Sequence, residues 1–132
     1  MIGVDTNVLL RLFLDDDKDQ HRVAKAFFAA RTRDDAAYVS VVTAVEFVWV
    51  LKRVYRRTQA EALSLLQLVL SSEDAVLEAG DRIRRALEIA LETGADFADV
   101  LIAGSAEFAG CEKTLTFDKV AAQRVPGMEV LG

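Results

Sequence analysis

The chain has 132 residues, of which 52% are hydrophobic and 28% charged, and this composition is typical of a globular domain and excludes a disordered chain. A formal net charge of -5 argues against a general nucleic-acid coat protein, which would be basic. The single cysteine, Cys111, cannot form a disulfide within the chain, and this favours a reducing compartment, the cytoplasm. No apolar run is long enough to span a bilayer, and Asp5 interrupts the apolar start, so we expect neither a membrane span nor a signal peptide.

Apolar runs separated by capping residues predict strands that alternate with helices. In chain order we expect a buried strand at 1–5, helices at 7–14 and 18–31, a strand at 37–39 and helices at 41–55 and 59–70. The second half should contain a strand at 75–78, helices at 81–92 and 98–109, a buried strand at 114–116 and a short strand at 128–131. This alternation predicts an α/β fold with a central parallel sheet flanked by helices.

The helix expected at 41–55 is apolar on nearly all sides. We expect its inner face to include Val42, Val45, Phe47, Trp49 and Val50. Glu46 lies within this stretch, and Val42, Trp49 and Val50 share its side of the helix. A charge there must reach solvent or meet a partner, and the apolar neighbours favour an inward-facing glutamate over a surface residue.

Two acids follow predicted strands. Asp5 ends the first strand, and Asp118 comes just after the strand at 114–116. In open α/β sheets, functional sites form at the carboxyl edge of the strands, so these two carboxylates are expected at one sheet edge. They would repel each other unless a cation lay between them. The alternative for Asp5 is that it caps the first helix.

Asp96 and Asp99 stand three residues apart at the start of the helix expected at 98–109, and both can face one side. Acids in a first turn are also favoured by the helix dipole, which is the structural alternative for either residue. Asp99 borders the apolar run that follows it, so Asp99 is the stronger functional candidate and Asp96 an accessory one.

Four or five carboxylates that converge without cysteine or histidine suit a hard cation, magnesium or manganese. The one histidine, His21, is expected at the surface, and zinc is therefore disfavoured. Acids that hold such a cation suit phosphodiester hydrolysis. Thr6, Asn7 and Thr116 could orient the acids or a bound water, although each could instead serve as a cap.

Basic residues are clustered despite the acidic total. One group, Lys52, Arg53, Arg56 and Arg57, follows Glu46; the others are Arg82, Arg84 and Arg85, and Lys113, Lys119 and Arg124. Most such groups are solvated surface, but phosphate contacts need only a local basic rim. Arg53 and Arg56 are the nearest candidates for RNA binding by their position in the chain.

Four motifs together resemble the PIN domains, and specifically the VapC-type ribonuclease toxins. They are Val4-Asp5-Thr6-Asn7-Val8-Leu9-Leu10, Ser40-Val41-Val42-Thr43 leading to Glu46, Phe97-Ala98-Asp99-Val100-Leu101-Ile102-Ala103, and Thr116-Phe117-Asp118. Each motif alone is weak, but all four in this order are specific, and the resemblance covers nearly the whole of residues 1–132.

The resemblance implies a single Rossmann-like domain and a magnesium- or manganese-dependent endoribonuclease. It implies that Asp5, Glu46, Asp99 and Asp118 are the catalytic, metal-holding acids, with Asp96 accessory and hydroxyl support from Thr6 and Thr116. It also implies RNA as the substrate, a homodimer, and a small cognate antitoxin as partner. The helix that carries Trp49 would form part of the dimer or antitoxin surface.

Three alternatives remain open from the sequence. A phosphoacceptor receiver domain has a similar length and parallel sheet. It would need adjacent acids after the first strand, where this chain has Asp5-Thr6, and a lysine ending the last core strand, where Thr116-Phe117-Asp118 offers none. A PIN-fold binding module is disfavoured by the intact acids. A PIN nuclease of RNA maturation is barely separable from a toxin by sequence alone.

Overall fold

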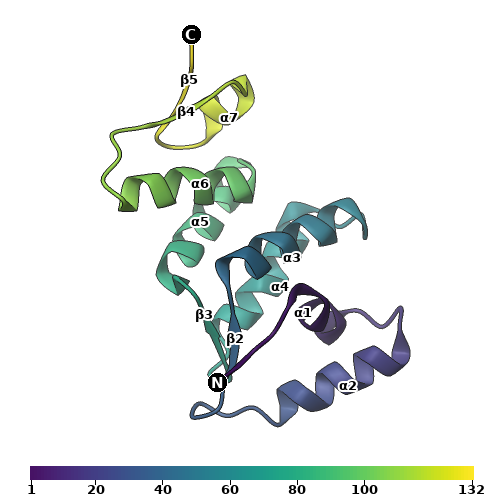
Figure 1. Cartoon of the computed structure of the whole chain (residues 1–132). Coiled ribbons are helices and arrows are strands. Elements are labelled where there is room, and N and C mark those ends of the chain that lie inside the picture. Colours follow the sequence, from purple (N-terminus) through teal and green to yellow (C-terminus); the bar gives the residue numbers. More distant parts are fainter. The chain divides into compact units, whose positions relative to one another are not determined.

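Seven helices and five short strands form the computed structural model, which describes residues 1–132 (Figure 1). Every strand pair is parallel, so the predicted α/β fold class is confirmed. The chain divides into two compact units, Met1–Gly80 and Asp81–Gly132. The position of one unit relative to the other is not determined. None of the helices combines the length and apolarity that a membrane crossing requires.

The first unit is a three-stranded sheet with four helices. Its elements are β1 (Ile2–Gly3), α1 (Thr6–Phe13), α2 (Lys18–Ala29), β2 (Ala37–Val39), α3 (Val41–Arg53), α4 (Gln59–Leu70) and β3 (Ala75–Leu77). The sheet order is β1-β2-β3, and the central strand β2 is buried through Ala37 and Val39. β1 lies at the sheet edge, and Met1 and Ile2 are exposed, so the predicted burial of the first strand is wrong.

Polar caps explain where the helices of this unit begin. The Ser40 hydroxyl accepts a hydrogen bond from the Thr43 amide at 3.1 Å and starts α3 directly after β2. Thr58 and Glu61 form the predicted capping box of α4. Hydrogen bonds from the Thr58 amide and hydroxyl hold the pKa of Glu61 below its usual value, since they stabilise the ionised carboxylate.

The core of the first unit lies where α3 packs against α1 and α4 (Figure 1). The buried face of α3 consists of Thr43, Ala44, Phe47, Val48 and Leu51. Of the expected inner residues, only Phe47 is buried; Val45 and Val50 are intermediate, and Val42 and Trp49 are exposed. The prediction failed because a helix that is apolar on nearly all sides gives no periodic signal for its inner face.

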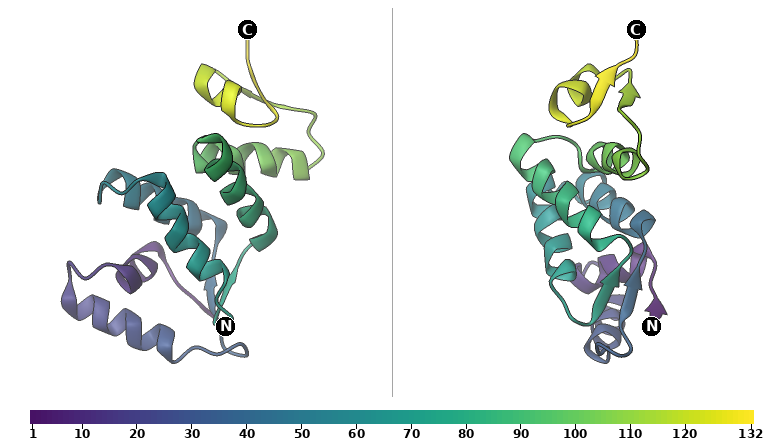
Figure 2. Two further views of the ribbon diagram at one scale, coloured as in Figure 1. Left: turned by 180° about the vertical axis from the view of Figure 1, so that it is seen from behind. Right: turned by 90° about the vertical axis from the view of Figure 1, so that its left-hand side faces the viewer.

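The second unit contains a two-stranded parallel sheet, β4 (Thr114–Thr116) and β5 (Met128–Val130). Its helices are α5 (Gly80–Thr93), which begins at the last residue of the first unit, α6 (Phe97–Phe108) and α7 (Lys119–Arg124). α7 packs on both strands, as Figure 2 shows. No helix was predicted at α7, because six residues are too few to show a periodic pattern. The strand β4 is less buried than predicted, since Leu115 is 48% exposed.

Candidate active site

The carboxyl edge of the β1-β2-β3 sheet gathers polar residues at helix starts. Asp5 follows β1, Ser40 follows β2, and Glu78 follows β3. Because the three strands are parallel, these residues lie at the same edge. Glu78, which the sequence analysis missed, accepts a hydrogen bond from the Val41 amide at 2.9 Å. Its position at the end of a predicted strand is the same signal that singled out Asp5.

Asp5 caps α1 and still has one carboxylate oxygen available. Oδ1 accepts the Val8 amide at 3.2 Å, whereas Oδ2 accepts no hydrogen bond and the carboxylate has no ion pair. The helix N-terminus stabilises the negative charge without neutralising it. The capping alternative for Asp5 is therefore confirmed, and the cap leaves a free oxygen that could hold a cation.

A cleft of about 570 Å³ lies beside Asp5, between the β1 end of the sheet and the helices α1 and α2. Its polar lining includes Asp5, Asn7 and Arg11, with Asp19 and Gln20 from α2. Asn7 is exposed here, in the first turn of α1, while the neighbouring Thr6 is buried. Two of the predicted supporting residues therefore adjoin Asp5, and Asn7 faces the same cleft as the acid.

Glu46 lies on the exposed side of α3, so the prediction of an inward-facing glutamate is wrong for this unit. The prediction that Glu46 shares its side of the helix with apolar side chains is confirmed. It lines a groove of about 520 Å³ together with Val42, Val45, Trp49 and Val50, and with Val41. The Glu46 carboxylate has no hydrogen bond or ion pair within the chain. An unpaired acid on an apolar surface can bind a cation or a donor from a ligand.

Asp118 repeats the arrangement of Asp5 in the second unit. It follows β4 and caps α7, with Oδ1 accepting the Val120 amide at 2.9 Å and the Ala121 amide at 3.0 Å. Oδ2 accepts no hydrogen bond, and no cation pairs with the carboxylate. Thr116 holds the backbone here, because its hydroxyl oxygen accepts the Asp118 amide at 3.0 Å. Thr116 thus positions Asp118, as a supporting residue would.

Asp96 and Asp99 share the first turn of α6. Asp96 is its N-cap, and its Oδ2 accepts the Asp99 amide at 3.2 Å. Asp99 is half-buried and Asp96 is exposed. Asp99 borders the buried Val100 and Leu101, as its place before an apolar run predicted.

The predicted acids are divided evenly between the units. Asp5 and Glu46 belong to Met1–Gly80, whereas Asp99 and Asp118 belong to Asp81–Gly132. β1 and β4 pair in different sheets, so the common sheet edge expected for Asp5 and Asp118 is not seen. No group of three or more histidine, cysteine, aspartate or glutamate side chains that could hold a metal ion is present.

The basic residues after Glu46 differ in their partners. Arg57 lies 3.6 Å from the Glu61 carboxylate, and Lys52 donates to the Gln59 amide oxygen at 3.2 Å. Arg53 and Arg56 are exposed and make no hydrogen bond or ion pair. Arg56 has a left-handed backbone, with φ of 57°, just past the end of α3. The two arginines named as RNA-binding candidates are therefore the ones available to a phosphate.

Comparison with known proteins identifies one family. The sequence matches the PIN domain family over residues 2–127, a span that includes all the predicted acids. No curated protein matches the sequence.

Proposed function

The chain belongs to the PIN domain family, whose members are generally nucleases, and we propose that this protein is a metal-dependent endoribonuclease, the VapC-type toxin of a type II toxin–antitoxin pair. The observation that carries the proposal is the form of the two helix-capping acids. Asp5 and Asp118 each follow a parallel strand, cap a helix with Oδ1 and keep Oδ2 unbonded. At each position the unbonded oxygen is available to a cation.

The donor set fits magnesium or manganese, because it consists of carboxylates without cysteine or histidine. In the proposal, Asp5, Glu46, Asp99 and Asp118 hold the ion, with Asp96 as an accessory acid. A metal bound there would supply charge to activate a water molecule and to stabilise the leaving oxygen. Asp5 and Asp118 are held in place by the amides that they cap, and Thr116 fixes the backbone of Asp118.

Cleavage of RNA should require a divalent hard cation. A structured RNA pool incubated with the protein should be cut with magnesium or manganese and remain intact with a chelator, because acids alone cannot offset the charge at the phosphate. Gel electrophoresis of the RNA measures the outcome. Asp99→Asn protein, purified in the same way, controls for contaminating ribonuclease. Equal cleavage with chelator would contradict the metal requirement.

Arg53 and Arg56 should supply part of the attraction that the net charge of -5 opposes. In Arg53→Gln/Arg56→Gln, RNA binding should weaken and the slope of log affinity against log salt should fall by about 1.4, which is roughly 0.7 for each lost phosphate contact to a single strand. Fluorescence anisotropy across a salt series measures both quantities. Arg33→Gln, which removes a cation paired with Glu73, is the matched control. If the double variant has the salt slope of the parent, the RNA phosphates contact other cations, and Lys113, Lys119 and Arg124 are the next candidates.

The proposed partners are a second copy of this chain and a small antitoxin. Support comes from apolar side chains that α3 and α4 leave exposed: Val42, Trp49 and Leu68. Light scattering at micromolar concentration should give twice the chain mass of 14.5 kDa. Trp49→Lys should shift the mass toward monomer, because a charge in an apolar contact is costly. A monomer for the parent protein would count against the dimer.

A PIN nuclease of RNA maturation is the remaining alternative within the family, since the family match leaves the receiver interpretation without support. A short reading frame beside the gene whose product restores growth after induction of this protein would favour the toxin. Harmless expression in the cytoplasm without such a neighbour would favour maturation.

A further inference from the structure

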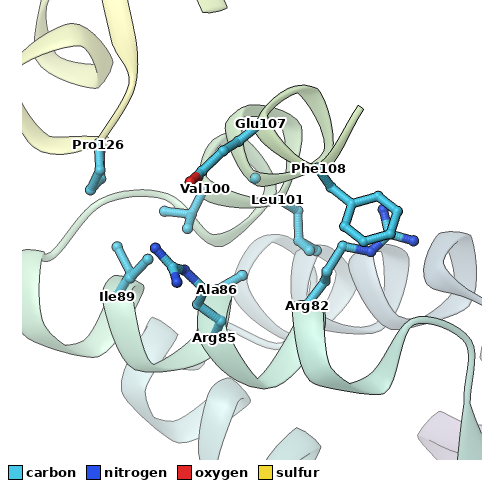
Figure 3. Close-up of a pocket in the computed structure, with 10 residues that line it drawn as sticks. Arg82, Arg85, Ala86, Ile89, Val100, Leu101, Glu107, Phe108 and Pro126 are labelled. Carbon is cyan, nitrogen blue, oxygen red and sulfur yellow. The ribbon is translucent and has the colours of Figure 1, made fainter. Parts of the chain in front are cut away.

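A cleft of about 260 Å³ between α5 and α6 contains none of the predicted catalytic acids. All of its residues belong to the second unit. Figure 3 shows side chains that come from the two helices and Pro126 that comes from the segment after α7. Its apolar floor is formed by Ala86, Ile89, Val100, Leu101 and Pro126, and its polar rim by Arg82, Arg85 and Glu107, with Phe108 at one end. The cleft is slightly smaller than the range typical of small-molecule pockets, which suits a single flat ring better than a larger ligand.

Arg82 and Phe108 form a preassembled stacking surface at the end of the cleft. The guanidinium carbon of Arg82 lies 4.3 Å from the centre of the Phe108 ring (Figure 3). Phe108 is the last residue of α6 and is 74% exposed, so its ring is accessible to a ligand. Exposed aromatic rings and guanidinium planes are the surfaces on which unpaired nucleobases stack.

Arg85 adds a cation without a partner. Its guanidinium makes no hydrogen bond or ion pair, and Figure 3 shows it directed between Ile89 and Val100 into the cleft. The neighbouring Arg84 is different, since it lies 3.8 Å from the Asp81 carboxylate. An unpaired arginine over an apolar floor offers the fork of donors that a phosphate accepts.

Glu107 gives the cleft an acceptor beside these cations. Its carboxylate has no hydrogen bond within the chain, and it extends toward Val100 in Figure 3. It would repel a phosphate but would accept a hydrogen bond from the exocyclic amino group of a base, as acids do with cytosine. Arg85 therefore suits the phosphate of a nucleotide, and Glu107 suits the amino group of its base.

We propose that the α5–α6 cleft binds one nucleotide of single-stranded RNA, with its base against Phe108 and Arg82, its phosphate on Arg85, and a base amino group on Glu107. The inference rests on the proposed ribonuclease function and deepens it. RNA is favoured over a protein segment as the ligand. The cleft combines a stacking surface, an unpaired cation and an acceptor for a base amino group, and its volume suits a single ring. Phe108 lies nine positions after Asp99, about 13.5 Å along α6 and half a turn around it, so this nucleotide lies away from Asp99.

RNA binding measured in the presence of a chelator tests the α5–α6 cleft, because the chelator blocks metal-dependent cleavage of the RNA. Anisotropy with labelled octacytidine should show Phe108→Ala weakening affinity roughly 5- to 150-fold, the range for losing one stacked base, with the salt slope unchanged. Arg85→Gln should lower the salt slope by about 0.7, because it removes one phosphate contact. The matched controls are Ile102→Ala, an exposed apolar residue of α6 outside the cleft, and Lys25→Gln, an exposed cation of the first unit; both should bind like the parent.

The base preference tests Glu107. The parent should bind octacytidine more tightly than octauridine, and Glu107→Ala should remove the difference. Equal affinity of the parent for the two oligomers would overturn the role of Glu107. Circular dichroism melts should show that each variant is folded, because Phe108, Arg85 and Glu107 are all exposed.

The outcomes separate this site from the nuclease proposal. If the parent cuts RNA while Phe108→Ala and Arg85→Gln bind like the parent, the cleft does not hold a nucleotide and the nuclease stands. If the parent cuts no RNA but the variants bind as predicted, the nucleotide site stands and the nuclease falls. Unchanged RNA binding together with a lower mass in light scattering would make the cleft a protein contact and overturn the proposal.

Discussion

Asp5→Asn is expected to reduce RNA cleavage by about a hundredfold or more and to leave the metal-free stability almost unchanged. Changes that only support a metal ligand already cost about 10- to 100-fold, and loss of a ligand should cost at least as much. Asparagine caps helices as well as aspartate does, so the hydrogen bond to the Val8 amide can persist. Cleavage rates with magnesium and thermal melts without metal measure the two effects.

Asp5→Ala is the matched variant that separates the two roles of this carboxylate. It should lose cleavage to the same extent and, in addition, about 1 kcal/mol of unfolding free energy, because alanine cannot cap α1. If Asp5→Asn cuts RNA like the parent, or melts as early as Asp5→Ala, Asp5 has only the structural role.

The largest effect on stability is expected at Phe47. Its side chain is fully buried in α3 and its ring centre lies 5.8 Å from that of Phe13 in α1. Phe47→Ala should therefore lower the unfolding free energy by about 3–5 kcal/mol, through lost burial and the cavity left behind. Urea titration followed by circular dichroism measures the change, provided that the slope with denaturant matches the parent.

Trp49→Ala is the control, since Trp49 lies two positions further along the same helix and is 58% exposed. It should change the free energy by less than about 1 kcal/mol. Equal losses for the two variants would mean that the buried face of α3 is not the one centred on Phe47.

Much of the fold was predictable because its boundaries have local chemical causes. The bounds of β2 and α4 agree with prediction, since Ser40 and the Thr58–Glu61 box mark helix starts in the sequence itself. Gly94 and Gly110, with φ of 71° and 93°, mark the ends of α5 and α6 in the same way. The inner face of α3 was not predictable, because burial depends on which neighbours cover an all-round apolar helix.

The candidate site was predictable as a set of residues and less so as an arrangement. Strand ends pointed to Asp5 and Asp118, and both indeed start helices. The same signal existed for Glu78, but the strand expected at 75–78 included it, whereas β3 ends at Leu77. The stacked pair of Arg82 and Phe108 joins residues 26 positions apart, and no local pattern relates them.

The even division of the acids between the two units has a genetic consequence. The first predicted acid is residue 5 and the last is residue 118, and the other two lie on either side of the Gly80 boundary. A premature stop codon anywhere before codon 118 therefore removes at least one carboxylate, and a restart of translation within the reading frame removes Asp5. If the protein arrests growth, survivors should carry truncations scattered along the gene, whereas their missense changes should gather at these four codons and at core positions such as Phe47.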